Sequence, residues 1–271
     1  MQSPHTQNGE SRKILELRRR ACLGHARIDD LTFAEAIECI AGLVARRRGG
    51  TVYTLNVDHL VLLEEDAHLR EAYAGASLVF AGGWPIVWAS RLIGTPVRAE
   101  ISSADLLRPL LRRAAEERWR VYLVGGGEGV AERAAERMTR EVSALNIVGI
   151  DARPGDGDWE LDRDSPAHDE LVAGVVSARA DLVVIALDSP AQEIVMHRIG
   201  VVVRPAVCIG VGAGLELFAG ASKRAPDLIT AAGLDWLFRF AHESRQLWCR
   251  HFVRDPRFAL ILLRQLRWSV L

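Results

Sequence analysis

The 271-residue sequence lacks any apolar run long enough to cross a membrane, because no stretch reaches the roughly 18 uncharged residues that a spanning helix requires. Residues 1–13 (MQSPHTQNGESRK) also lack the apolar core of a secretory signal peptide. These two absences predict a cytoplasmic protein.

Cysteine is scarce, and the four cysteines form no CxxC pair, which argues against a structural metal site or a disulfide framework. They are Cys22, Cys39, Cys208 and Cys249. We expect free thiols in a reducing compartment. We also expect neither a bound metal ion nor a cofactor.

Neither sign of charge dominates, because 34 basic residues stand against 35 acidic ones and the net charge is −1. This balance argues against a nucleic-acid partner. The average hides an asymmetry, since residues 221–271 carry nine basic and four acidic residues, which makes this segment +5 and the remainder −6. Three of the seven tryptophans (Trp236, Trp248 and Trp268) lie in the same segment. The sequence therefore predicts a basic, aromatic C-terminal appendage.

Short β-rich runs alternate with helical patterns along a chain that is 49% apolar and 25% charged, as in a globular protein with a hydrophobic core. The expected strands are apolar on both faces and lie at 51–55, 77–81, 120–124, 146–150, 181–187 and 206–211. Helices are expected at 27–48, 66–74, 84–93, 104–117, 128–141, 166–178 and 191–199, with a surface loop at 153–166. This alternation predicts an α/β fold, a Rossmann-like parallel sheet with helices on both faces, followed by the basic C-terminal helical appendage.

Glycine-rich turns follow two of the expected strands. In a parallel sheet, ligands bind beyond the carboxyl ends of the strands, so these turns are candidate binding elements. Gly125–Gly129 joins a strand to an amphipathic helix, where backbone N–H groups can hold a diphosphate. The spacing departs from the dinucleotide pattern GxGxxG, which requires glycine where Val130 stands. A tight turn that needs glycine for positive φ explains Gly125–Gly129 equally well. A second turn, Gly210–Gly214, favours a nucleotide or sugar-nucleotide site.

Several short motifs occur in one order over roughly residues 50–260. They are Thr54-Leu55-Asn56-Val57-Asp58-His59, Gly125-Gly126-Gly127-Glu128-Gly129-Val130-Ala131, Ser189-Pro190-Ala191-Gln192-Glu193, Gly210-Val211-Gly212, Ala219-Gly220, Lys223-Arg224-Ala225-Pro226, Gly233-Leu234-Asp235-Trp236-Leu237-Phe238-Arg239 and Asp255-Pro256-Arg257-Phe258. Each motif is weak alone, but the ordered set resembles the WecG/TagA/CpsF glycosyltransferases, glycosyltransferase family 26.

The resemblance implies an inverting enzyme that needs no metal. Such an enzyme moves an N-acetylhexosamine-type sugar from a UDP-sugar to a polyprenyl-diphosphate-linked acceptor in cell-envelope or exopolysaccharide synthesis. Polarity, charge and patterning along the chain predict three parts: a disordered N-terminus (1–20), an α/β sugar-nucleotide-binding core (21–222) and the helical appendage (223–271). The basic helices at 226–271 are expected to lie on the inner face of the cell membrane. The alternative is that their aromatic residues pack onto the core or onto a neighbouring subunit. The sequence leaves open whether the chain forms a homo-oligomer.

The resemblance further implies which residues bind substrate. Thr54 and Asn56 are expected to line the active site, the two glycine turns to hold the nucleotide sugar, and Gln192 to contact substrate. The full expected set is Thr54, Asn56, Gly82, Gly83, Gly125, Gly126, Gly127, Gln192, Glu193, Gly210, Gly212, Lys223, Arg224 and Arg239. Stabilisation of the leaving UDP is assigned to helix N-termini together with Lys223, Arg224, Arg239 or Arg245.

Two departures from the family pattern affect the chemistry. The family's P-D-G-x-G supplies an aspartate as general base, and here Gly82 occupies that position. The family's R-V-x-G-x-D-L begins with an arginine for the donor, and here Glu100 reverses that charge. Two smaller departures are Ala191 for a lysine and Glu216 for an aspartate.

Inverting transfer needs a group that takes the acceptor's proton. The candidate replacements are Asp58, His59, Glu100, Asp105 and Asp188. Structural roles are open for several of them, because Asp105 can cap its helix and Asp58 or His59 can begin one.

Three functions remain open from the sequence. The first is an active transferase with a relocated base. The second is a catalytically silent paralogue that binds a sugar nucleotide or assists a partner enzyme, suggested by Gly82 and Glu100. The third is an NAD-dependent Rossmann oxidoreductase, which rests on the glycine turn alone, since no catalytic Tyr-x-x-x-Lys set accompanies it.

Overall fold

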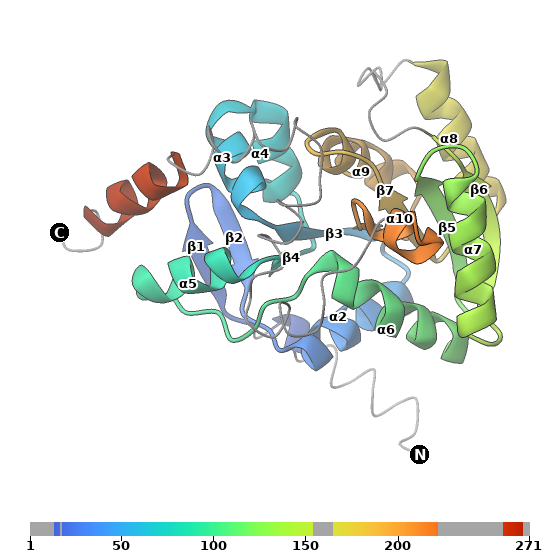
Figure 1. Ribbon diagram of the computed structural model, residues 1–271, viewed down its shortest axis with the longest axis horizontal. Helices are drawn as coiled ribbons and strands as arrows, with labels where there is room; N and C mark the ends of the chain where they lie inside the picture. Colours follow the sequence, from blue (N-terminus) through green and yellow to red (C-terminus); the bar gives the residue numbers. More distant parts are fainter. Residues whose placement is uncertain (1–13, 17, 154–164, 222–256, 268–271) are drawn as a thin grey trace.

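The computed structural model describes residues 14–16, 18–153, 165–221 and 257–267. Its centre is a six-stranded parallel sheet with the strand order β4-β3-β8-β7-β5-β6 (Figure 1). The strands are β3 (Gly50–Leu55), β4 (Leu78–Ala81), β5 (Arg120–Gly125), β6 (Asn146–Asp151), β7 (Leu182–Ala186) and β8 (Val207–Gly210). The α/β fold and all six expected strands are confirmed, each strand to within one residue at either end.

Helices pack on both faces of this sheet because successive strand residues point to opposite faces and both faces are apolar. In β3, for example, Val52 and Tyr53 are both buried but belong to two different hydrophobic clusters. The cluster around Tyr53 includes side chains from α3 (Val57–Glu65), α4 (Ala67–Ala74), α5 (Trp84–Leu92), α8 (Pro166–Ser177) and α9 (Ala191–Val202). The cluster around Val52 includes side chains from α2 (Phe33–Ala45), α6 (Ser103–Glu116), α7 (Val130–Glu141) and α10 (Gly214–Ala219).

The N-terminal part of the expected helix at 27–48 is wrong. Ala26–Asp29 forms strand β2, which pairs antiparallel with β1 (Arg20–Leu23). The turn between them contains Gly24 with φ of +53°, a conformation that favours glycine. The helix α2 begins only after Thr32, whose side chain forms a capping box with Glu35. The short helix α10 was not expected from the sequence, whereas α3 agrees with the alternative in which Asp58 or His59 begins a helix after the first strand.

A buried carboxylate fixes the β1–β2 hairpin to the main sheet. Asp29 is 3% exposed and accepts hydrogen bonds from the side chains of Arg18 and Arg20. Its second oxygen accepts the backbone N–H of Val79 in β4 at 2.9 Å. Arg18 lies within the segment 1–20 that was expected to be disordered, yet its ion pair with Asp29 holds it against the core.

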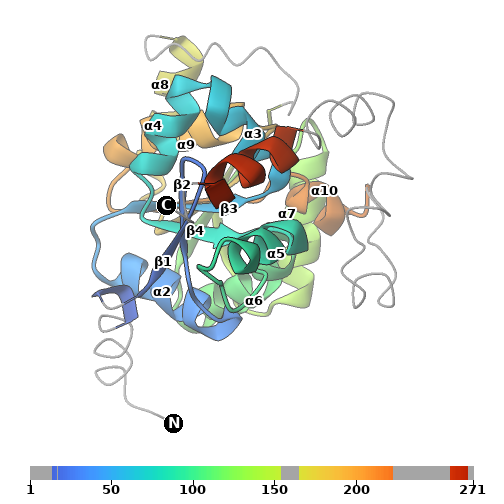
Figure 2. The ribbon, with the colours of Figure 1, turned by 90° about the vertical axis from the view of Figure 1, so that its left-hand side faces the viewer.

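The last described helix covers residues 257–267 and contacts the N-terminal hairpin. The side chain of Gln265 accepts the N–H of Gly24 at 2.9 Å and donates to the carbonyl oxygen of Cys22 at 2.7 Å. Ile261 is buried there, and Arg264 pairs with Glu64 of α3. Figure 2 shows this helix beside the hairpin and α3, on the side of the molecule that also carries α5. A C-terminal helix is therefore present, as expected; residues 222–256 lie outside the described residues.

Candidate active site

The carboxyl ends of β4 and β3 bring Gly82 and Glu100 to one place. The N–H of Gly82 donates to the carbonyl oxygen of Leu55 at 2.8 Å. The N–H of Ile101 donates to the carbonyl oxygen of Ala81 at 2.7 Å, so the segment containing Glu100 runs beside the end of β4. Glu100 is partly buried. The two positions that depart from the family pattern are thus neighbours at the edge where ligands are expected.

Asn56 stands directly after β3 and begins α3. Its Oδ1 accepts the backbone N–H of His59 at 2.9 Å, which caps the helix, and the residue itself is exposed. Thr54 and Asp58 flank it and are partly buried. The expected site residues Thr54 and Asn56 therefore lie at the open edge of the sheet. The side-chain oxygen of Asn56 is already used to cap α3.

Gly82 has little space for a side chain. A Cβ atom there would lie 3.1 Å from Cβ of Thr54 and 3.2 Å from the carbonyl oxygen of Leu55. A carboxylate at this position therefore requires the end of β3 to shift by a few tenths of an ångström. Gly83 is less crowded, since its nearest contact would be Cδ of Pro85 at 3.6 Å.

Asp105 takes part in capping α6. Its N–H donates to the hydroxyl of Ser102 at 3.2 Å, and that hydroxyl donates to the Asp105 carboxylate at 2.7 Å. This arrangement matches the helix-capping alternative for Asp105. Asp188 is exposed after β7, and its carbonyl oxygen accepts the N–H of Gln192 at 2.9 Å.

The glycine turn after β5 is built around close backbone contact. Gly125 has φ of +94°, and a Cβ there would lie 2.0 Å from the carbonyl oxygen of Ala186 in β7. The N–H of Gly126 donates to this same oxygen at 3.2 Å, and the N–H of Gly127 donates to the carbonyl oxygen of Arg153 at 2.8 Å. These two amides thus hold the turn together. An anion at this turn must therefore be bound by amides farther along, toward the start of α7.

Gln192 connects the ends of β7 and β8. Its Oε1 accepts the N–H of Gly212 at 2.8 Å, and its Nε2 donates to Oε1 of Glu193 at 2.6 Å. Gln192 is 5% exposed. A Cβ at Gly210 would lie 2.6 Å from Nε2 of Gln192, so glycine is needed there for the amide to fit. Gln192 thus lies at the expected site. Its hydrogen bond to the N–H of Gly212 helps to hold the second glycine turn in shape.

A buried polar cluster lies behind this edge. Nε2 of His59 is 2.6 Å from the hydroxyl of Ser189, and Nδ1 is 2.7 Å from the hydroxyl of Tyr73 in α4. Oε1 of Glu193 lies 3.9 Å from Nε2 of His59. The hydroxyl of Tyr53 donates to the carbonyl oxygen of Glu193 at 3.2 Å. The cluster therefore joins the first turn of α3 to the loop after β7.

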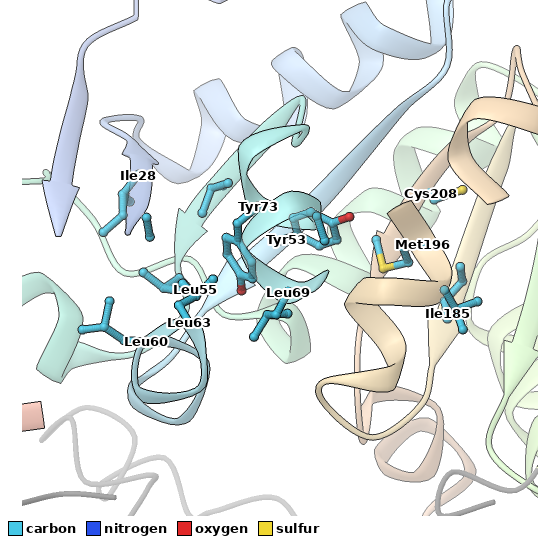
Figure 3. Close-up of a cluster of buried hydrophobic side chains, with 14 of the residues drawn as sticks. Ile28, Tyr53, Leu55, Leu60, Leu63, Leu69, Tyr73, Ile185, Met196 and Cys208 are labelled. Atoms are coloured by element: carbon cyan, nitrogen blue, oxygen red, sulfur yellow. The ribbon is translucent and has the colours of Figure 1, made fainter. Parts of the chain in front are cut away.

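The two tyrosines of this cluster stay protonated. Burial raises the pKa of Tyr73 well above its usual range and raises that of Tyr53 as well, and the nearby Glu193 adds to both shifts. Their rings lie 5.0 Å apart, and Figure 3 shows their hydroxyl groups pointing in different directions. Sequence analysis missed Tyr73, because nothing in the sequence indicates that it reaches His59 from the next helix.

No group of three or more His, Cys, Asp or Glu side chains suited to a metal ion occurs in the described part of the chain. Cys39 and Cys208 are buried, and burial raises the pKa of each thiol to about 12, whereas Cys22 is exposed. Four expected basic residues, Lys223, Arg224, Arg239 and Arg245, and the fourth cysteine, Cys249, lie outside the described residues. In the described part, no helix is long and apolar enough to cross a membrane.

Comparison with known protein families gives one match, and it extends over nearly the whole sequence. The model of the Glycosyl transferase WecG/TagA/CpsF family covers residues 21–270, which includes the sheet, the cluster around His59 and the C-terminal helix. The match agrees with the ordered motifs that lie at the carboxyl edge of the sheet. The chain therefore belongs to the WecG/TagA/CpsF family of glycosyltransferases.

Proposed function

We propose that this protein is an inverting glycosyltransferase that moves an N-acetylhexosamine-type sugar from a UDP-sugar to a polyprenyl-diphosphate-linked acceptor in cell-envelope or exopolysaccharide synthesis. The observation that carries the proposal is the convergence of Asn56, Gln192 and Gly212 at one edge of the sheet, in a chain of this family. No metal ion takes part. Helix N-termini and the basic residues Lys223, Arg224, Arg239 and Arg245 stabilise the UDP leaving group.

A catalytically silent sugar-nucleotide-binding protein is the second candidate. Gly82 and Glu100 favour it, because they replace the family's base and its arginine at adjacent positions. UDP release separates the two functions. The full-length protein is incubated with a panel of UDP-N-acetylhexosamines and a short-chain prenyl-diphosphate-linked sugar. UDP release supports the transferase, whereas UDP binding without release from any donor supports the silent protein.

The third candidate, an NAD-dependent oxidoreductase, rested on the turn at Gly125–Gly129. Two of the turn's amides bind the protein itself, and the family is one of glycosyltransferases. Stabilisation of the protein by NAD and not by UDP in a thermal-shift comparison would reopen this function.

Restoring a carboxylate at position 82 tests the assignment of the site. Gly82→Ala adds only a Cβ atom near Thr54, so it measures the cost of crowding. Gly82→Asp adds the same crowding together with a general base, which contributes about 10²–10⁴-fold where it acts. We expect Gly82→Asp to release UDP at least about tenfold faster than Gly82→Ala. Equal rates for the two variants would place the reacting hydroxyl away from position 82.

We also propose that residues 226–271 bind an anionic membrane from the cytoplasmic side. The described helix at 257–267 carries three arginines and no acidic residue. Leu260 and Leu263 are 64% and 57% exposed. Figure 2 shows α5 on the same side of the molecule, and Trp88 of this helix is 51% exposed. Apolar and basic side chains together are typical of helices that lie in a lipid headgroup layer.

The membrane proposal predicts co-sedimentation with liposomes that contain anionic lipid. Binding should weaken with salt and with the double change Leu260→Ser and Leu263→Ser. The matched control is Val201→Ser and Val202→Ser, which changes two exposed apolar residues of α9 instead. Binding that is equally strong in all three proteins would contradict the proposed surface.

A further inference from the structure

We propose that His59 and Ser189 form the proton relay that takes the acceptor's proton in this protein. The inference deepens the proposed function and rests on it. His59 lies in the first turn of α3, which follows β3, and Ser189 lies in the loop after β7, so both come from the edge that holds Asn56 and Gly212. Ser189 is partly buried and His59 is 5% exposed, which puts the hydroxyl nearer to the open edge and the imidazole behind it.

The contacts of the imidazole suit a proton acceptor. Nε2 faces the hydroxyl of Ser189 at 2.6 Å, within the range of a hydrogen bond. Nδ1 faces the hydroxyl of Tyr73 at 2.7 Å. When Nδ1 carries its proton and donates to Tyr73, Nε2 is free to accept the proton of Ser189. The phenol of Tyr73, whose pKa is raised by burial, stays neutral throughout.

Glu193 provides the charge that an imidazolium needs. Its carboxylate is 1% exposed, and Oε1 lies 3.9 Å from Nε2 of His59. Its Oε2 is one of two buried side-chain polar atoms without a hydrogen-bond partner in the described part of the chain. A buried carboxylate with an unpaired oxygen is costly, and a positive charge forming on the neighbouring imidazole reduces that cost. The carboxylate of Glu193 therefore lies where it can stabilise an imidazolium that forms during the transfer.

The step balances in protons and electron pairs. The acceptor oxygen forms a bond to the anomeric carbon as its proton passes to Oγ of Ser189, and the proton of Ser189 passes to Nε2 of His59. The bond from the anomeric carbon to the diphosphate oxygen breaks, and UDP leaves with the electron pair. Water then takes the proton from the imidazolium. Ser189 contacts the substrate in this scheme, and His59 acts through it.

The test compares His59→Gln and Ser189→Ala with the wild type in the UDP-release assay described above. Glutamine keeps a polar side chain near Ser189 but cannot take a proton. We expect kcat to fall about 10²–10⁴-fold in His59→Gln, with KM within about threefold. Ser189→Ala leaves the imidazole in place and should lower kcat at least about tenfold. The matched control, His68→Gln, changes an exposed histidine of α4 and should keep wild-type kcat.

The pH profile distinguishes the relay from a merely structural role. The relay needs a neutral imidazole at position 59, so wild-type kcat should have an acidic limb that His59→Gln lacks. The groups facing His59 are Ser189, Tyr73 and Glu193, and Asp58 precedes it on α3.

A His59→Gln variant that retains kcat within threefold, or that retains the acidic limb, overturns the relay and leaves the transferase intact. If His59→Gln does not fold, wild-type kcat in Ser189→Ala overturns the relay on its own. Absence of UDP release from the wild type overturns the transferase and the relay together.

Discussion

Gly125→Ala is expected to destabilise the protein by about 4 kcal/mol or more, because two costs add at one residue. Gly125 has φ of +94°, which strains any residue with a Cβ atom. That Cβ would also lie 2.0 Å from the carbonyl oxygen of Ala186 and 2.7 Å from its carbon, so β5 and β7 would have to separate. Urea unfolding of the variant measures the loss of stability.

Gly127→Ala is the matched control for this prediction. Gly127 has φ of +68° in the same turn, but a Cβ there would meet no atom within 4 Å. Only the backbone strain of about 1–2 kcal/mol remains. Equal losses in the two variants would mean that close contact with β7 does not determine the need for glycine at position 125.

Asp29→Ala is expected to cost about 3–5 kcal/mol, the usual effect of removing one partner from a buried ion pair. The change leaves Arg18 without its carboxylate partner, although the guanidinium still donates to the carbonyl oxygens of Leu15 and Ser77. It also leaves the buried N–H of Val79 without an acceptor. The hairpin should therefore detach from β4 before the sheet unfolds. Hydrogen exchange in β1 and β2, together with urea unfolding, measures both effects.

Asp30→Ala serves as the neighbouring control. Asp30 pairs with Arg98, whose side chain is 47% exposed, so its contribution is about 1 kcal/mol or less. A loss of the same size in Asp29→Ala would show that burial of Asp29 adds nothing to its ion pair.

The sheet could be predicted from the sequence because its strands are apolar on both faces and short. Val183 and Ile185 face one hydrophobic cluster while Val184 faces the other. The strand therefore stands out in the sequence as an uninterrupted apolar run. The hairpin could not be predicted in this way. Ile28 pairs with Ala21 of β1, and the next residue, Asp29, accepts the backbone N–H of Val79, which is 50 residues away in the sequence. The run 26–29 gives no sign of either partner.

The location of the candidate site residues at one edge of the sheet could be predicted from the sequence, but their contacts could not, and their binding roles stay predictions. Asn56 and Gln192 were identified from ordered motifs, and both lie at the carboxyl edge. The partner of Gln192 is a backbone amide 20 residues away, and the partner of His59 on α4 is 14 residues away. Such pairs depend on how helices pack, which short motifs do not record.

The helix α3 links two regions that lie far apart in the sequence. Asn56 stands at its start, and Glu64 and Glu65 near its end pair with Arg264 and Arg257 of the C-terminal helix. Nine helical residues span about 13 Å, and a helix of that length moves as a stiff rod. The helix for which we propose membrane contact and the edge at which we propose the reaction are therefore joined through the two ends of α3.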